Sequence, residues 1–156
     1  MGTAPAVGTK APAFKLPSDD GETLSLADFK GRKLVLYFYP RANTPGCTRE
    51  AIDFSGLRAQ FAKAGTDILG ISADPVSAQG AFKKKHKLKI GLLSDETRKV
   101  IEAYGIWGKK SLYGKSFMGI VRSTFLIGPD GRIARVWPKV KVAGHAAEVL
   151  EAARAL

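Results

Sequence analysis

Three short apolar runs stand out along the chain, separated by longer polar stretches. They are LVLYFY (Leu34–Tyr39), DILGIS (Asp67–Ser72) and STFLIG (Ser123–Gly128). Continuous apolar runs of this length are typical of strands that are buried on both faces of a sheet. The turn sequence GPDG ends the third run, and RIARVW (Arg132–Trp137) follows it. We therefore expect a closing antiparallel hairpin.

Helical spacing fills the intervals between these runs. Asp74 followed by Pro75 predicts the start of a helix, with Asp74 as the N-cap and proline in the first turn. Two apolar stripes with three- and four-residue steps predict a helix after the first strand and another at the C-terminus. The first stripe is Cys47, Ala51, Phe54, Leu57, Phe61 and Ala64, and the second is Val142, Ala146, Val149, Leu150 and Ala153.

The order of these elements predicts the fold class. A strand–helix–strand crossover gives two parallel strands, and the closing hairpin adds an antiparallel pair. The chain is therefore expected to be α/β, with a central mixed sheet flanked by helices, as in the thioredoxin fold. Residues 1–156 would form a single domain, with an N-terminal extension and an insertion between Leu92 and Gly119.

Composition narrows the cellular setting. A hydrophobic content of 45% is ordinary for a soluble globular domain, and no apolar stretch approaches the length of a membrane span. The first residues, MGTAPAVGTKAPAFKLP, lack the pattern of a secretory signal. The single cysteine cannot form an internal disulfide, and so we expect a reducing, cytoplasmic location.

The net charge of +11 has two interpretations. A basic surface can bind nucleic acid or another polyanion, or it can simply be solvated. The densest run is KKKHKLK (Lys83–Lys89), whose lysines would point in several directions on a helix, with no aromatic residues between them. This arrangement favours a solvated face.

The chemically informative segment is Thr44-Pro45-Gly46-Cys47. Threonine is a good N-cap and proline suits the first helical position, which makes Cys47 the third residue of the helix. The free N–H groups and the positive end of the helix favour a thiolate there, and a threonine hydroxyl at this spacing can donate a hydrogen bond to it. The competing interpretation is a buried, unreactive cysteine, because Cys47 also lies on the apolar stripe.

Pro40, Thr44 and Cys47 form a P-x-x-x-T-x-x-C motif within YFYPRANTPGCTREAIDF. This segment resembles the active site of the peroxiredoxins, and is closest to the Q-type subfamily, the bacterioferritin comigratory proteins. The resemblance extends over nearly the whole chain, from GTKAPAFKLP near the start to YGIWGKKSLYGKSFMGIVRSTFLIGPDGRIARVW.

The resemblance implies a role for each residue of the motif. Cys47 would attack a peroxide oxygen and become sulfenic acid, with Thr44 bonding the thiolate and Pro40 shielding the sulfur. Arg122 would stabilise the thiolate and orient the peroxide. The expected topology supports this choice, since the strand after Arg122 should begin beside the end of the first strand. Glu50 would either orient Arg122 or be an exposed helix carboxylate.

The resemblance also implies an activity: a thiol peroxidase that reduces hydrogen peroxide and organic hydroperoxides without metal, haem or flavin. It would serve cell redox homeostasis and antioxidant defence, as a monomer or a dimer. Many relatives carry a second, resolving cysteine at the position of Ile52 or near Lys83, and neither is cysteine here. The chain would therefore be a one-cysteine variant that an external thiol regenerates, from thioredoxin, glutaredoxin or glutathione.

Other functions have weaker support. A disulfide reductase would need a C-x-x-C motif, but Thr44 stands at the first position. A nucleic-acid-binding module would depend on net charge alone. His86 and His145 are interpreted as surface residues, and their spacing predicts no metal site. We expect no membrane partner and no specific nucleic-acid partner.

Overall fold

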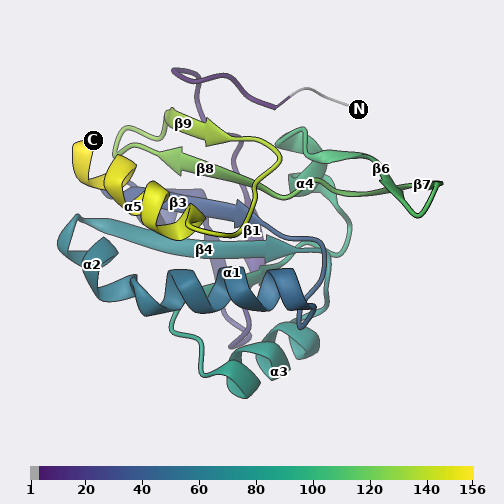
Figure 1. Ribbon diagram of the computed structural model, residues 1–156. Coiled ribbons are helices and arrows are strands. Elements are labelled where there is room, and N and C mark those ends of the chain that lie inside the picture. Colours follow the sequence, from purple (N-terminus) through teal and green to yellow (C-terminus); the bar gives the residue numbers. More distant parts are fainter. Residues whose placement is uncertain (1–3) are drawn as a thin grey trace.

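A five-stranded mixed sheet forms the centre of the computed structural model, which describes residues 4–156 (Figure 1). The strand order is β5-β4-β3-β8-β9. The strands are β3 (Lys33–Phe38), β4 (Thr66–Ser72), β5 (Gly91–Ser94), β8 (Ser123–Ile127) and β9 (Ile133–Trp137). β3, β4 and β5 run parallel to one another, whereas β8 is antiparallel to both β3 and β9. The predicted α/β fold with a mixed sheet is therefore confirmed.

β3 lies at the middle of the sheet and is buried on both faces. Val35 and Tyr37 contribute to the apolar cluster on one face, while Leu36 and Phe38 contribute to the cluster on the other. This alternation explains why the first apolar run of the sequence is continuous. The expected strand at residues 34–39 is displaced by a single residue, and the next two expected strands are also present.

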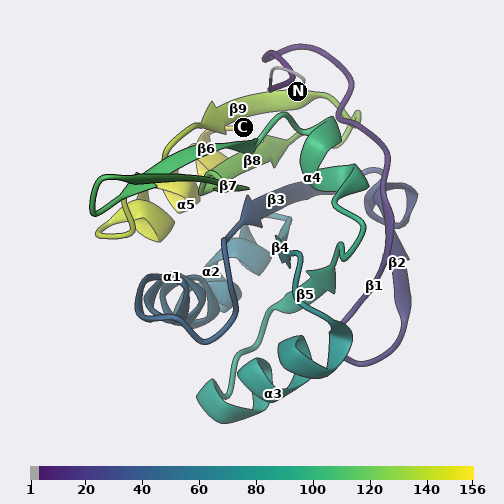
Figure 2. The same ribbon diagram turned by 90° about the vertical axis from the view of Figure 1, so that its right-hand side faces the viewer.

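Helices cover both faces of the sheet (Figure 2). The cluster that contains Cys47 lies beneath α1 (Pro45–Gly56), α2 (Arg58–Lys63), α3 (Val76–His86) and α5 (His145–Ala155). On the opposite face, α4 (Lys99–Ala103) packs together with the N-terminal segment. That segment contains β1 (Lys15–Pro17), β2 (Thr23–Ser25) and the 3₁₀ helix η1 (Leu26–Phe29).

Two helix predictions need correction. The single helix expected from Cys47 to Ala64 is divided at Leu57, which ends α1 and precedes α2. Gly56, with its low helix propensity, immediately precedes this break. The N-cap of α3 is Pro75 rather than Asp74. The Asp74 carboxylate instead accepts hydrogen bonds from the backbone N–H of Ala42 at 2.7 Å and from Ser72 Oγ at 2.6 Å.

The predicted insertion contains elements that the hydrophobic pattern did not reveal. It holds most of β5, then α4, and then a separate hairpin of β6 (Trp107–Leu112) and β7 (Lys115–Ile120). The hairpin projects from the edge of the molecule in Figure 1. Lysine, serine and glycine interrupt the apolar residues of its strands, WGKKSL and KSFMGI, which explains why it carries no continuous apolar run.

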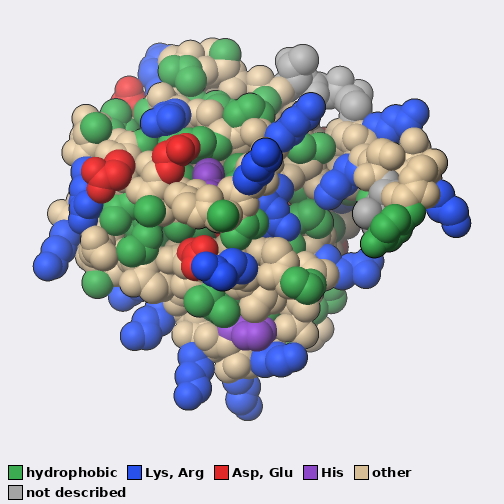
Figure 3. Space-filling view, in the orientation of Figure 1, with side chains coloured by type: hydrophobic (Ala, Val, Ile, Leu, Met, Phe, Trp, Pro, Cys, Tyr) green, Lys and Arg blue, Asp and Glu red, His purple; other side chains and the backbone are tan. Residues whose placement is uncertain are grey.

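Basic side chains are spread over the molecular surface. Figure 3 shows Lys and Arg side chains across the whole visible face, over α3 and on the projecting hairpin, rather than gathered in one patch. Lys83, Lys84, Lys85 and His86 form the last turn of α3. This distribution agrees with a solvated basic surface. Of the helices in the described part of the chain, none has the length and apolar character needed to cross a membrane.

Candidate active site

Cys47 lies in the first turn of α1, directly after the loop that follows β3. Thr44 is the N-cap and Pro45 begins the helix, as the sequence predicts. Cys47 is only 1% exposed and packs in the apolar cluster with Ala51 and Phe54. The sulfur therefore lies both at a helix N-terminus and in a dry environment. The thiolate is the reactive form of cysteine, so a nearby positive charge bears on the reactivity of this group.

Arg122 supplies that charge. It directly precedes β8, and the β3–β8 register pairs Phe38 with Ser123, so the start of β8 lies beside the end of β3. The Nη2 atom of Arg122 donates a hydrogen bond to Cys47 Sγ at 3.3 Å. Gly46 leaves room for this approach, because a Cβ atom there would lie only 3.1 Å from Arg122 Nη2. The sequence places Gly46 in the first turn of the predicted helix, but its packing against Arg122 was not predicted.

Glu50 holds the other side of the guanidinium group. Arg122 Nη1 donates to Glu50 Oε1 at 2.6 Å, and Glu50 is 1% exposed. The alternative of an exposed helix carboxylate is therefore wrong. Burial raises the pKa of Glu50 to about 7, and the charge of Arg122 offsets only part of that effect. Within the described residues, Glu50 Oε2 has no hydrogen-bond partner, which adds to the cost of ionising this carboxylate.

The ion pair keeps Arg122 charged in this environment. Burial acts to lower the pKa of Arg122, but Glu50 and Cys47 together hold that pKa above its ordinary value. One fixed guanidinium thus joins a buried carboxylate to a buried sulfur. A fixed cation in contact with a sulfur can stabilise a thiolate and a developing negative charge beside it.

Thr44 and Pro40 lie in the same loop, and Thr44 makes a different contact from the one expected. The Thr44 hydroxyl donates to the backbone carbonyl of Arg41 at 2.8 Å and not to Cys47. Pro40 is half-buried at the carboxyl end of β3. The structure therefore joins Cys47, Arg122 and Glu50 by hydrogen bonds, while Thr44 and Pro40 border the site from the loop.

The surface interpretation of His145 is wrong. Its side chain is buried between Phe54 and Trp137, with both rings edge-on, and its Nε2 atom lies 2.8 Å from Thr124 Oγ1. Burial lowers the pKa of His145 to about 4. His86 is partly exposed and lies 3.0 Å from Asn43 Oδ1. Across residues 4–156, no three His, Cys, Asp or Glu side chains lie close enough together to hold a metal ion.

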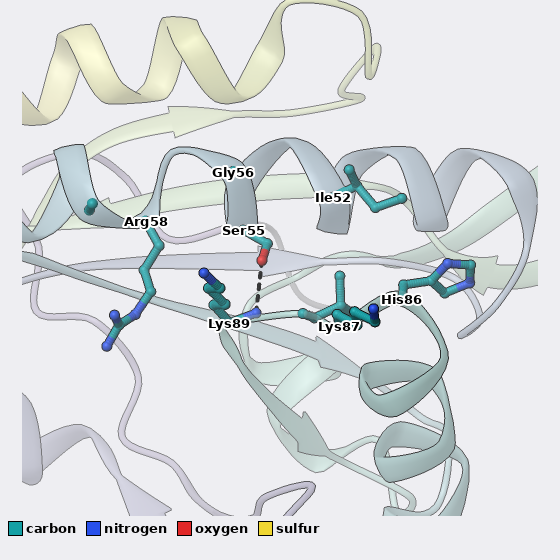
Figure 4. A pocket seen from close by; sticks show the side chains of 9 residues that line it. Ile52, Ser55, Gly56, Arg58, His86, Lys87 and Lys89 are labelled. Atoms are coloured by element: carbon teal, nitrogen blue, oxygen red, sulfur yellow. Dashed lines mark hydrogen bonds between the residues drawn. The ribbon is translucent and has the colours of Figure 1, made fainter.

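A separate hollow of about 380 Å³ lies beside α1 (Figure 4). It is lined by α1, the start of α2 and the segment from His86 to Lys89, and the Lys89 N–H donates to Ser55 Oγ at 2.7 Å. Ile52, at a position where the resemblance implies a resolving cysteine in many relatives, is 44% exposed at its edge. Neither Cys47 nor Arg122 lines this hollow. It is therefore distinct from the sulfur site.

Comparison with known proteins decides the family. The profile of the AhpC/TSA family matches residues 7–136. The chain belongs to the AhpC/TSA family. It is 48% identical over 145 residues to peroxiredoxin Bcp of Bacillus subtilis, covering 93% of this chain and 92% of that protein. These matches identify it as a peroxiredoxin of the Bcp, or Q-type, group, and its single cysteine makes it a one-cysteine member.

Solved structures agree with this assignment. The fold matches a cysteine-to-serine mutant of PrxQ from Xylella fastidiosa with a TM-score of 0.93, at 36% identity over 99% of this chain and 98% of that one. It also matches the bacterioferritin comigratory protein of Xanthomonas campestris with a TM-score of 0.89, at 40% identity over 96% and 98% of the two chains. As a peroxiredoxin, the chain is a thiol-dependent peroxidase.

Proposed function

We propose that Cys47 is the peroxidatic nucleophile and that Arg122 is its principal activating partner. The observation that carries this proposal is the hydrogen bond from Arg122 Nη2 to Cys47 Sγ, at 3.3 Å, in the first turn of α1. Nucleophilic attack requires the thiolate, and a fixed cation beside a helix N-terminus favours that form.

The reaction follows from these groups. The Cys47 thiolate attacks one peroxide oxygen, an S–O bond forms as the O–O bond breaks, and the second oxygen leaves as water or an alcohol. The proton that the peroxide carried moves to the leaving oxygen. The sulfur is oxidised to the sulfenic state while the peroxide is reduced. Arg122, held in place by Glu50, would stabilise the negative charge on both the sulfur and the leaving oxygen.

Thr44 and Pro40 complete the proposed site. The Thr44 hydroxyl would turn from the Arg41 carbonyl toward a bound peroxide, because hydroxyl groups reorient readily. Pro40 contributes no N–H and would keep water away from the sulfur at the end of β3. Glu50 is proposed to act through Arg122 and not on the substrate.

The substrates are proposed to be hydrogen peroxide and alkyl hydroperoxides. The solved bacterioferritin comigratory protein from Xanthomonas campestris is described by its alkyl peroxide reduction activity, and this chain shares its fold and 40% of its sequence. With one cysteine in the chain, an external thiol would regenerate Cys47 in two exchange steps. The single cysteine also supports the prediction of a reducing, cytoplasmic location.

An assay with separate reductants tests this function. Purified protein would be mixed with hydrogen peroxide or an alkyl hydroperoxide, with thioredoxin, glutaredoxin or glutathione supplied one at a time. We expect peroxide consumption that depends on both the protein and one of these thiols. A folded Cys47→Ser variant should be inactive, because serine is a poor nucleophile without an activating base. Full activity in that variant would remove Cys47 from its proposed role.

A further inference from the structure

A second basic side chain lies on the β6–β7 hairpin, whose second strand leads directly to Arg122. Lys110 lies on β6, opposite Phe117 of β7. Its stem crosses Gly119, where an added Cβ atom would lie 3.1 Å from Lys110 Cδ. The Lys110 ammonium group then donates a hydrogen bond to the backbone carbonyl of Ile120 at 3.0 Å. The side chain is therefore directed to the base of the hairpin and away from its tip.

The base of the hairpin is joined directly to the sulfur site. Ile120 is the last residue of β7, and Arg122 follows two residues later, with its guanidinium group 3.3 Å from Cys47 Sγ. The Val121 N–H donates to the carbonyl of Ile106 at 2.7 Å, which closes the base of the hairpin. Figure 2 shows the hairpin on the side of the sheet that α1 covers.

The electrostatic surroundings of Lys110 agree with this geometry. Its pKa is lowered, first by burial and then by the positive charge of Arg122, while the charge of Cys47 acts in the opposite direction. The ammonium group is thus within the electrostatic range of both groups. The adjacent Lys109 points to the other face of the hairpin, opposite Met118, and is exposed.

We propose that Lys110 assists the peroxidase site through its positive charge. Together with Arg122, it would stabilise the Cys47 thiolate and the negative charge that develops on the leaving oxygen. This inference rests on the proposed role of Cys47 as the nucleophile. Lys110 acts at a distance through its charge; its stem crosses Gly119, and its ammonium group is held by the Ile120 carbonyl. If Lys110 had only a structural role, its effect would depend on its hydrogen bond to the Ile120 carbonyl or on the packing of its aliphatic stem, and not on its charge.

Four variants separate charge from structure. Lys110→Met keeps an apolar stem, Lys110→Gln keeps a donor for the Ile120 carbonyl, and Lys110→Arg keeps the charge. Lys109→Gln removes the same charge from the exposed face of the same strand. Circular dichroism and thermal unfolding show whether each variant is folded. Because Lys110→Met and Lys110→Gln both remove the charge, the test can use one of them if the other is unstable.

Two measurements are made on each variant at the same pH and low salt. The first is the rate of Cys47 alkylation by a neutral haloacetamide, together with the ultraviolet absorbance of the thiolate, which needs no peroxide. The second is the rate of oxidation by hydrogen peroxide. We expect the neutral Lys110 variants to be slower by about tenfold in both reactions. Lys110→Arg should recover most of the rate, and Lys109→Gln should match the unmodified protein.

Three results would each overturn the proposal. If folded Lys110→Met and Lys110→Gln reacted as fast as the wild-type protein, Lys110 would not act on the sulfur. A loss in Lys109→Gln equal to that in Lys110→Gln would assign the effect to the overall charge of the protein. A folded Lys110→Arg variant as slow as Lys110→Met would show that charge is not what matters. The alkylation measurement stays informative even if Cys47 proves not to reduce peroxide, so the two proposals can fail separately.

Discussion

Phe38, the last residue of β3, is paired with Ser123, the first residue of β8, across an antiparallel ladder. Because the two strands run in opposite directions, the loop that follows β3 and the residue that precedes β8 lie at the same end of these neighbouring strands. This register brings Arg122 to Cys47 although 75 positions separate them in the sequence. The geometry of the site is therefore set by strand pairing in the core.

Removing Arg122 should damage both reactivity and stability. In Arg122→Ala, Cys47 loses its 3.3 Å donor and Glu50 remains buried without its ion-pair partner. We expect peroxide reduction to slow by about 100- to 1,000-fold. The free energy of unfolding should fall by about 1–3 kcal/mol, because a Glu50 carboxyl with a pKa of about 7 takes up a proton when its partner is removed. Stopped-flow oxidation and urea unfolding measure these effects.

Arg49→Ala is the matched control for that experiment. Arg49 is on the same helix as Cys47 and pairs with Asp53 at 3.2 Å, but its side chain is 73% exposed. An exposed pair contributes only about 0–1 kcal/mol. If Arg122→Ala retained the unmodified oxidation rate, or if Arg49→Ala lost as much, the assignment of Arg122 would be contradicted.

Glu50 should make stability fall as the pH rises. Its pKa in the folded protein, about 7, exceeds the ordinary value of 4.5, so the folded state binds more protons than the unfolded state between these values. The free energy of unfolding should therefore decrease from about pH 4.5 to about pH 7 through this group. Glu50→Gln should lack this contribution. Denaturant unfolding at several pH values gives the difference, and parallel curves for the two proteins would refute it.

His145 should act in the opposite direction. Its folded pKa of about 4 lies below the ordinary value of 6.5, so the unfolded state binds the extra proton in this interval. The protein should lose stability through His145 as the pH falls from about 6.5 to about 4. His145→Gln should reduce that loss, while His86→Gln, at a partly exposed site, serves as control. If the stability of His145→Gln and of His86→Gln depended on pH in the same way, the effect assigned to the buried His145 would be contradicted.

Oxidation without reductant should be damaging. No second thiol exists in the chain, so a sulfenic acid at Cys47 cannot be protected by an internal disulfide. Excess peroxide should convert it to sulfinic and sulfonic acid with lasting loss of activity. The competing product is a dimer linked through Cys47, which would require the buried sulfur to become exposed. Non-reducing electrophoresis at several protein concentrations distinguishes them, and a dominant dimer even in dilute samples would contradict the external-thiol route.

The sequence was most informative where local chemistry and burial agree. β3 and β8 are continuous apolar runs because both faces of these strands are covered, and Thr44 and Pro45 mark the start of α1 through capping preferences. The position of Arg122 followed from the expected strand order. The buried ion pair with Glu50 remained one of two options, because a single helix carboxylate does not reveal which neighbour faces it.

The remaining features depend on tertiary contacts that leave little trace in a local pattern. β5 has only four residues and gains its partner from β4. His145 is flanked by Gly144 and Ala146 in the sequence and carries no spacing pattern, but the fold brings Phe54 and Trp137 against its ring. Gly46 looks like an ordinary helix-start residue, and only the approach of Arg122 shows that a side chain there would be crowded.

The most direct test of the proposed mechanism is the intact mass of the protein after one equivalent of peroxide, without reductant. Cys47 should gain one oxygen, an increase of about 16 Da, and dimedone should trap it as a sulfenic acid. Peptide mapping should locate the adduct at Cys47, and Cys47→Ser should give none. Loss of peroxide with no oxygen on Cys47, or an equal mass gain in Cys47→Ser, would contradict the mechanism.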